Sequence, residues 1–175
     1  MISPPADPAP IVPPQIVLVN PKSNAAVVSY VLADAYAYQM EAGERQKLDA
    51  PPERKWTIAF DRGDGSETAR YSLKEGTYEF KLTSEGWDLY RKQFNVTIDN
   101  SGMEIGFAYL ADGQQTVVAA GQTQAHSGDF PLEVVFDRGD GGEPAREMLE
   151  SGVYTVGLDV TKQRLNLLPA DKLAQ

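Results

Sequence analysis

The sequence contains no cysteine and only one histidine among its 175 residues. Disulfides, thiolate nucleophiles and cysteine metal sites are therefore excluded. A histidine-based metal site would need more ligands than His126, and no Gly-x-Ser-x-Gly motif supplies the nucleophile of a Ser–His–Asp triad. The glycines match neither a phosphate-binding loop nor a dinucleotide fingerprint. We therefore expect a chain that is not an enzyme and has no catalytic, metal or cofactor site.

Long apolar runs and clusters of basic residues are also missing. No stretch approaches the roughly 18 apolar residues of a membrane span, and no basic-then-apolar leader opens the chain. The formal net charge is −9, without any Lys/Arg run, so nucleic acid and anionic membrane surfaces are not expected partners. Apolar residues nowhere keep a helical period over more than two turns, which predicts a low helix content.

A hexapeptide, Phe-Asp-Arg-Gly-Asp-Gly, occurs twice, at residues 60–65 and 136–141. An apolar run precedes each copy, and Ala-Arg and then Gly-x-Tyr follow each copy at the same spacing. A fixed internal period is the signature of repeated structural modules. We predict an all-β protein with two tandem antiparallel β-sandwich-like modules, residues 16–93 and 94–175.

Proline is concentrated at the start of the chain, where six of the 12 prolines fall within the first fourteen residues. This composition predicts a semi-rigid, extended stalk over residues 1–15. Stalks of this kind commonly join a membrane anchor to an outward module. We therefore expect an extracytoplasmic location (periplasmic, cell-surface or secreted) and a longer natural protein.

Apolar side chains alternate through both modules, as in half-buried strands. Within residues 56–60, Trp56, Ile58 and Phe60 share one face. In the second module, the dipeptide at residues 112–113, Asp-Gly, predicts a tight type I′ hairpin turn. We align residues 104–111 with 26–33, at an offset of 78, and residues 162–166 with 86–90, at an offset of 76.

The hexapeptide has three interpretations. Its Arg-Gly-Asp is the tripeptide that many integrin ligands display on a hairpin tip. Two carboxylates beside a glycine turn can also bind Ca²⁺, although the twelfth residues from Asp61 and Asp137 are Ser72 and Met148, which excludes an EF-hand. We favour a structural hairpin tip, in which the first aspartates accept backbone N–H bonds and the glycines adopt positive φ. The residues concerned are Asp61, Arg62, Gly63, Asp64, Gly65, Asp137, Arg138, Gly139, Asp140 and Gly141.

Four aromatic residues distinguish the first module from the second. Exposed aromatic side chains on β-sandwiches can form sugar- or peptide-binding platforms, so we expect any protein or carbohydrate ligand to bind the first module. The alternative for the tryptophan is a plug that closes the core. The four residues are Trp87, Tyr90, Tyr36 and Tyr38, and their aligned counterparts are Gln163, Asn166, Gln114 and Thr116.

Residues 73–78 carry the pattern Leu-x-x-Gly-x-Tyr, which resembles bacterial prealbumin-like β-sandwich modules of the carboxypeptidase-regulatory-like and Cna-B-like kinds. More closely, Phe-Asp-Arg-Gly, Ala-Arg-Tyr, Glu-Gly-x-Tyr-x-Phe and Gly-Trp-Asp-Leu-Tyr resemble uncharacterised tandem repeat modules of planctomycete-type bacteria. The resemblance covers about half of one module. It implies a β-sandwich that serves as a non-catalytic spacer or adhesive part of a larger envelope protein.

We therefore expect a non-catalytic structural or binding module of a bacterial cell envelope or secreted protein. The alternative is an accessory domain of a larger enzyme, whose catalytic domain would lie outside this chain. A hydrolase domain in the full-length protein would favour the alternative, whereas a membrane anchor or further repeats would favour the first interpretation.

Overall fold

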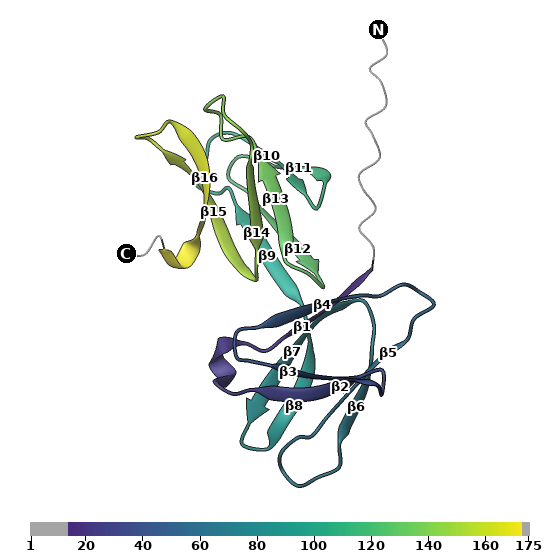
Figure 1. Cartoon of the computed structure of the whole chain (residues 1–175). Coiled ribbons are helices and arrows are strands. Elements are labelled where there is room, and N and C mark those ends of the chain that lie inside the picture. Colours follow the sequence, from purple (N-terminus) through teal and green to yellow (C-terminus); the bar gives the residue numbers. More distant parts are fainter. Residues whose placement is uncertain (1–13, 173–175) are drawn as a thin grey trace. The chain divides into compact units, whose positions relative to one another are not determined.

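The computed structural model describes residues 14–172, which form two compact units that divide between Lys92 and Gln93 (Figure 1). The predicted stalk lies outside the described residues except for its last two. Of these, Gln15 already belongs to the first strand, so the folded part begins slightly earlier than predicted.

Unit 1 consists of two four-stranded sheets, with the strand orders β4-β1-β7-β8 and β3-β2-β5-β6. Neighbouring strands are antiparallel, except that β1 and β7 run parallel. The strands are β1 (Gln15–Val19), β2 (Val28–Leu32), β3 (Tyr36–Met40), β4 (Arg45–Asp49), β5 (Trp56–Phe60), β6 (Ala69–Leu73), β7 (Gly76–Thr83) and β8 (Gly86–Lys92).

Unit 2 repeats this arrangement strand for strand, with the orders β12-β9-β15-β16 and β11-β10-β13-β14 and a parallel pair β9–β15. The predicted all-β fold with two tandem sandwich-like modules is confirmed. The strands are β9 (Phe94–Asp99), β10 (Phe107–Ala111), β11 (Gln114–Val118), β12 (Thr123–Gly128), β13 (Leu132–Phe136), β14 (Ala145–Leu149), β15 (Gly152–Asp159) and β16 (Arg164–Pro169).

Helical structure within residues 14–172 is confined to two three-residue 3₁₀ turns, η1 (Lys22–Asn24) and η2 (Ala170–Lys172). No helix in this range is long and apolar enough to cross a membrane. The low helix content follows from the period-two apolar pattern, which places side chains on alternate faces of strands.

Each unit has a hydrophobic core of its own, and the two cores share no residue. In unit 1, the predicted inward face of β5 is buried, with Ile58 fully inaccessible. Phe80 lies at the centre, with its ring 5.4 Å from that of Tyr30 and 5.5 Å from that of Phe60. In unit 2, Phe107, Tyr109 and Phe136 form the corresponding aromatic group, together with the aliphatic residues Val96, Ile98, Val134 and Leu149.

A fully buried asparagine follows the first strand of each unit. The Nδ2 of Asn20 donates to the carbonyl oxygens of Ala26 and Met40, both at 2.9 Å. The Nδ2 of Asn100 likewise donates to three carbonyl oxygens of unit 2, those of Ile105, Val118 and Ala119. The sequence pattern Asn-Pro predicts only a turn after Asn20, whereas the structure shows that the amide also joins the loop at Ala26 to the end of β3.

The chain enters and leaves each unit at the same end of one sheet. In unit 1, Ile16 of β1 pairs with Gly76 of β7, and Thr77 of β7 pairs with Lys92 of β8. In unit 2, residues 96 and 152 pair in the same way, and so do residues 154 and 169. The first and last strands therefore have their outer ends only two strands apart, about 10 Å at the usual strand spacing.

The pairing registers correct the predicted alignment of the last strands. Leu82 pairs with Trp87 in unit 1, and Leu158 pairs with Leu165 in unit 2. The counterpart of Trp87 is therefore Leu165 and not Gln163, since the β15–β16 turn is two residues longer than the β7–β8 turn. A length difference in a turn shifts the alignment without altering the sheet.

A second correction concerns the β2 and β10 strands. Leu32 pairs with Tyr36 across a three-residue loop, whereas Ala111 pairs with Gln114 across the two-residue Asp-Gly turn. Both turn residues of unit 2 have positive φ, 47° and 79°, as the type I′ prediction requires. Because of the extra loop residue, β2 and β10 align at an offset of 79 instead of 78, and Tyr30 matches Tyr109.

Candidate binding site

The hexapeptide lies in the loop between β5 and β6 in unit 1 and in the loop between β13 and β14 in unit 2. The Oδ1 of Asp61 accepts a hydrogen bond from the N–H of Gly63 at 2.7 Å, and the Oδ1 of Asp64 accepts one from Ser66. Asp137 and Asp140 make the same bonds to Gly139 and Gly142. All four glycines, at positions four and six of the two hexapeptides, have φ between 75° and 79°. The tip thus has the predicted structural geometry in both units.

Arg62 attaches this tip to the neighbouring edge strand β8. Its Nη1 lies 3.2 Å from the Oδ2 of Asp88, and its Nη2 donates to the hydroxyl of Tyr71 at 3.0 Å. Tyr71 donates in turn to the Oδ1 of Asp88. The carbonyl of Arg62 also accepts a 2.7 Å bond from the N–H of Trp87. The arginine of the Arg-Gly-Asp sequence is therefore bound within its own unit, which does not favour integrin recognition.

Unit 2 has an arginine at the same position, Arg138, but the acidic residue near it lies on a different strand. Arg138 donates to the Oδ1 of Asn166, which occupies the place of Asp88, and its Nη2 lies 3.9 Å from Glu147, which occupies the place of Tyr71. Its carbonyl accepts a bond from Leu165, as the carbonyl of Arg62 does from Trp87. The attachment of the tip to the last strand is thus common to both units, with different side chains.

The two carboxylates have opposite pKa shifts. Partial burial raises the pKa of Asp88, but hydrogen bonds from Tyr71, the Leu89 N–H and Arg62 together outweigh it and bring the pKa below its ordinary value. In unit 2, burial raises the pKa of Glu147, and the charge of Arg138 offsets this only in part. The ionised acid is therefore stabilised in unit 1 and disfavoured in unit 2.

These shifts predict opposite pH effects for Asp88→Asn and Glu147→Gln. Because the folded-state pKa of Asp88 is lowered, its contribution is present above the ordinary value of 3.8 and disappears as the pH falls through the folded-state pKa. Asp88→Asn should therefore cost less than about 1 kcal/mol at pH 7, since the pair is partly exposed, and nothing in strong acid. Because the pKa of Glu147 is raised, its ionisation costs stability as the pH rises above 4.5, so Glu147→Gln should help most at neutral pH. Thermal melts between pH 2 and 7 measure both, and a pH-independent difference in either variant would contradict the assignment.

Calcium binding is the remaining interpretation of the tip aspartates. In the part of the chain that the structure describes, no group of three or more acidic or histidine side chains is placed to hold a metal ion. We expect excess Ca²⁺ to leave the melting temperature unchanged. A rise of several degrees that disappears in the double variant Asp64→Ala/Asp140→Ala would show that these acids bind the ion, because a ligand of the folded state stabilises it.

The four predicted aromatic residues do not lie on one strand or one sheet. Tyr36 and Tyr38 lie on the edge strand β3, with 50% and 39% of their surfaces exposed. Tyr90 is exposed on β8, the edge strand of the other sheet, where the Nζ of Lys81 lies 5.4 Å from its ring centre. Trp87, on the opposite face of β8, packs against the core with its ring perpendicular to that of Phe80. Only the two β3 tyrosines form a pair.

Trp87→Ala is expected to destabilise unit 1 by about 2–4 kcal/mol, because the ring is half-buried against Phe80 and truncation leaves a partial cavity. Tyr90→Ala, a matched change at an exposed ring of the same strand, should cost less than about 1 kcal/mol. Chemical denaturation measures both values. A tryptophan variant as stable as the tyrosine variant would contradict a core role for Trp87.

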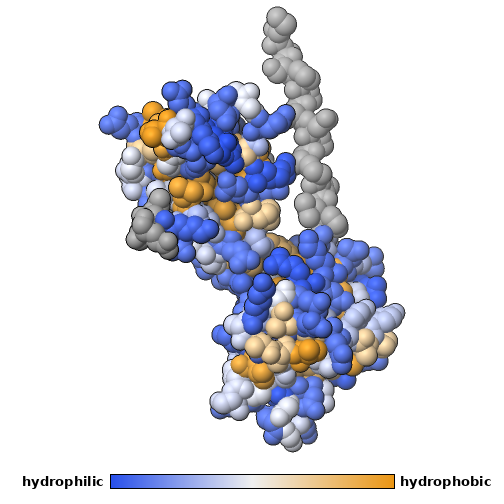
Figure 2. Space-filling view, turned by 60° about the vertical axis from the view of Figure 1, so that its left-hand side comes forward, coloured by the Kyte–Doolittle hydropathy of each residue, from blue (hydrophilic) through white to orange (hydrophobic). Residues whose placement is uncertain are grey.

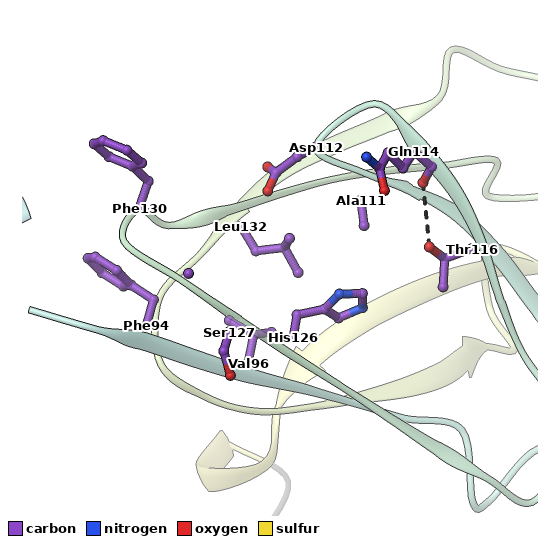
Figure 3. Close-up of a pocket in the computed structure, with 11 residues that line it drawn as sticks. Phe94, Val96, Ala111, Asp112, Gln114, Thr116, His126, Ser127, Phe130 and Leu132 are labelled. Atoms are coloured by element: carbon purple, nitrogen blue, oxygen red, sulfur yellow. Dashed lines mark hydrogen bonds between the residues drawn. The ribbon is translucent and has the colours of Figure 1, made fainter. Parts of the chain in front are cut away.

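The surface is mostly hydrophilic, with apolar patches on both units (Figure 2). A hollow of about 230 Å³ opens in unit 2, lined by residues of β9, β10, β11, β12 and β13 (Figure 3). Phe94 and Phe130 lie together at one end, and Gln114, Thr116 and His126 lie at the other. Its remaining lining residues are Val96, Ala111, Asp112, Ser127, Gly128 and Leu132.

His126 is fixed from inside the sandwich. Its Nε2 lies 2.6 Å from the hydroxyl of Tyr109, and the two rings are perpendicular. Burial raises the pKa of Tyr109 to about 12 and lowers the pKa of His126, with Asp112 opposing the second shift. Both groups are therefore neutral at pH 7. We assign the hydroxyl as the donor to Nε2, which leaves the ring proton on Nδ1.

Comparison with known proteins gives no family for this chain: no protein-family model and no curated protein sequence matches it. The hollow and the buried asparagines were not predicted from the sequence. The usable signal for the hollow was the replacement of two tyrosines by Gln114 and Thr116. From the sequence, we expect this replacement to remove a binding site, whereas in the structure both residues line the hollow.

Proposed function

We propose that the chain is a non-catalytic structural and binding module of an extracytoplasmic protein, in a bacterial envelope or secreted. The observation that carries this proposal is the duplication of a complete eight-stranded sandwich, in which each copy keeps its own core. Repetition of self-sufficient units is typical of proteins that extend or present a surface. The resemblance of residues 73–78 to prealbumin-like modules supports the same role.

The side chains that look reactive in the sequence are engaged in structural contacts. The hexapeptide aspartates accept bonds from their own loop, Arg62 and Arg138 attach the tip to the last strand, and His126 bonds Tyr109. Among the exposed aromatic residues of unit 1, Tyr36 and Tyr38 lie on the same strand, β3, whereas Tyr90 lies apart on β8. Exposed aromatic rings contribute strongly to protein and carbohydrate recognition, so we assign the β3 edge as the partner contact of unit 1.

Two measurements test the proposal. Antibody detection in fractions of the source cells should place the protein in the envelope or the medium, and a cytoplasmic location would contradict the proposal. The purified chain should hydrolyse none of a panel of esters, glycosides and peptides. Turnover that is lost in His126→Ala but kept in Gln124→Ala, an exposed residue of the same strand, would overturn the non-catalytic role.

The partner contact has its own test, in which the labelled chain is retained on isolated envelope material. Tyr36→Ser should reduce this retention, whereas Tyr90→Ser, at the opposite edge of the unit, should not. Both rings are about half exposed, so neither change should disturb the fold. Equal retention of both variants and the wild type would remove the β3 edge from the proposal.

A further inference from the structure

The hollow of unit 2 exists because its walls carry smaller side chains than the same positions of unit 1. In unit 1, the ring of Tyr38 covers that of Tyr30, with 5.7 Å between ring centres. In unit 2, Thr116 takes the place of Tyr38, so no second ring stacks on Tyr109 from this position, and Thr116 lines the hollow instead. Other neighbouring positions change in the same direction: Leu32, Tyr36, Ala50 and Trp56 correspond to Ala111, Gln114, Gly128 and Leu132.

Polar side chains occupy several of the positions at which unit 2 has smaller side chains than unit 1. His126 occupies the position of the buried Leu48, opposite Val96 as Leu48 is opposite Ile16. A histidine at the edge of a core is most simply explained as a partner for the Tyr109 hydroxyl. That explanation accounts for Nε2 alone. In unit 1, the corresponding hydroxyl, that of Tyr30, donates to the Oε1 of Gln46, so the hydroxyl does not require a histidine as its partner. The histidine ring also lines the hollow beside the hydroxyl of Thr116 and the amide of Gln114.

The lining combines neutral hydrogen-bonding groups with an aromatic wall. Gln114 and Thr116 can both donate and accept, His126 donates through Nδ1, and the carboxylate of Asp112 accepts. The Asp112 carboxylate also accepts the N–H of Glu133 at 2.9 Å, which fixes its orientation. A single carboxylate beside neutral groups repels anions and offers only one partner to a cation. Hydroxyl groups, which both donate and accept, match this set of side chains best.

We propose that the hollow of unit 2 binds one neutral polyhydroxylated ring, the size of a single sugar residue. Its hydroxyls bond Asp112, Gln114, Thr116 and His126, and its apolar face lies on Phe130, which is partly exposed. A volume of about 230 Å³ is below the roughly 300–1,000 Å³ of sites for drug-sized ligands, which limits the ligand to one ring. This inference rests on the proposed binding role of the chain, and it places a carbohydrate site in unit 2, whereas the sequence predicts one in unit 1.

The intact chain, titrated with glucose, galactose, mannose and N-acetylglucosamine and followed by NMR, tests the proposal. At least one sugar should produce saturable shifts of the Gln114 side-chain amide and the His126 ring. Choline and acetate serve as the cationic and anionic probes. Saturable binding of either ion at these signals without any sugar binding would overturn the assignment, and so would the absence of any sugar response.

Unit 1 suggests the most informative variant, Thr116→Tyr, which introduces the tyrosine ring that unit 1 has at this position. It should lower sugar affinity at least tenfold, whereas Thr161→Tyr, in the exposed β15–β16 turn, should leave it unchanged. Asp112→Asn keeps the bond to Glu133 and should weaken binding several-fold, which tests the site even if the tyrosine variant does not fold. Unchanged affinity in Thr116→Tyr or in Asp112→Asn would place the sugar elsewhere. Binding followed by chemical conversion of the sugar would overturn the non-catalytic proposal while the site remained.

Discussion

Asn20→Asp is expected to destabilise unit 1 by about 3–5 kcal/mol at pH 7, although the two side chains have nearly the same shape. The amide donates two bonds to the carbonyls of Ala26 and Met40 from a fully buried position. A carboxylate turns these donors into acceptors, so two buried carbonyls lose their partners and a charge is buried without a cation. Each unsatisfied buried group costs about 1–3 kcal/mol, and a charge costs more.

The pH dependence separates this mechanism from a general packing defect. Burial raises the folded-state pKa of the new carboxyl, so the variant regains stability as the pH falls through that pKa toward the unfolded value of about 3.9. Denaturant melts of wild type and variant should converge at acidic pH. Asn20→Ala, which leaves a cavity without a charge, should show no such convergence, and parallel curves for all three proteins would contradict the account.

Gly86→Ala should cost about 2–5 kcal/mol, because no space exists for a single added methyl group. Gly86 has a φ of 95°, and a Cβ at this position would lie 2.1 Å from the carbonyl oxygen of Arg62. That oxygen accepts the N–H of Trp87, so the methyl group must push apart the backbone contact that joins the hexapeptide loop to β8. Overpacking against backbone costs about 1–3 kcal/mol, and the strained conformation adds about 1–2 kcal/mol.

Gly63→Ala is the matched control within the same loop. Gly63 also has a positive φ, 79°, but a Cβ there would meet nothing within 4 Å. Its cost should therefore be about 1 kcal/mol, from backbone strain alone. Calorimetry compares the two variants, and equal losses would show that the contact between the loop and β8 has no role in stability.

The architecture could be predicted from the sequence because apolar residues alternate with polar ones along half-buried strands. Trp56, Ile58 and Phe60 alternate and are buried as predicted, and the two hexapeptides adopt the same loop. The registers could not be predicted, because turns that differ by one or two residues realign whole strands. This error paired Trp87 with Gln163 instead of Leu165.

The hollow could not be predicted from the sequence, for a related reason. It is lined by polar, aliphatic and aromatic residues from several strands, and these residues do not form a local motif. Thr116 and His126 are ten residues apart on different sheets, and they approach the same space only because β11 and β12 lie at the same side of the sandwich. A comparison of the two units position by position identifies the site, but only after the registers are known. Sequence patterns therefore predicted the strand architecture, whereas the hollow depends on how side chains from different strands pack together.

The paths by which the chain enters and leaves each unit also determine how the protein would respond to tension. A force applied to the outer ends of β1 and β8 acts at one end of the sheet, across the strands. Hydrogen bonds loaded in this way break one after another, whereas strands pulled lengthwise must break all of theirs together. Each unit would therefore open at low force and release roughly 250 Å of chain, at about 3.3 Å per residue. Two such units in series would act as a compliant extension.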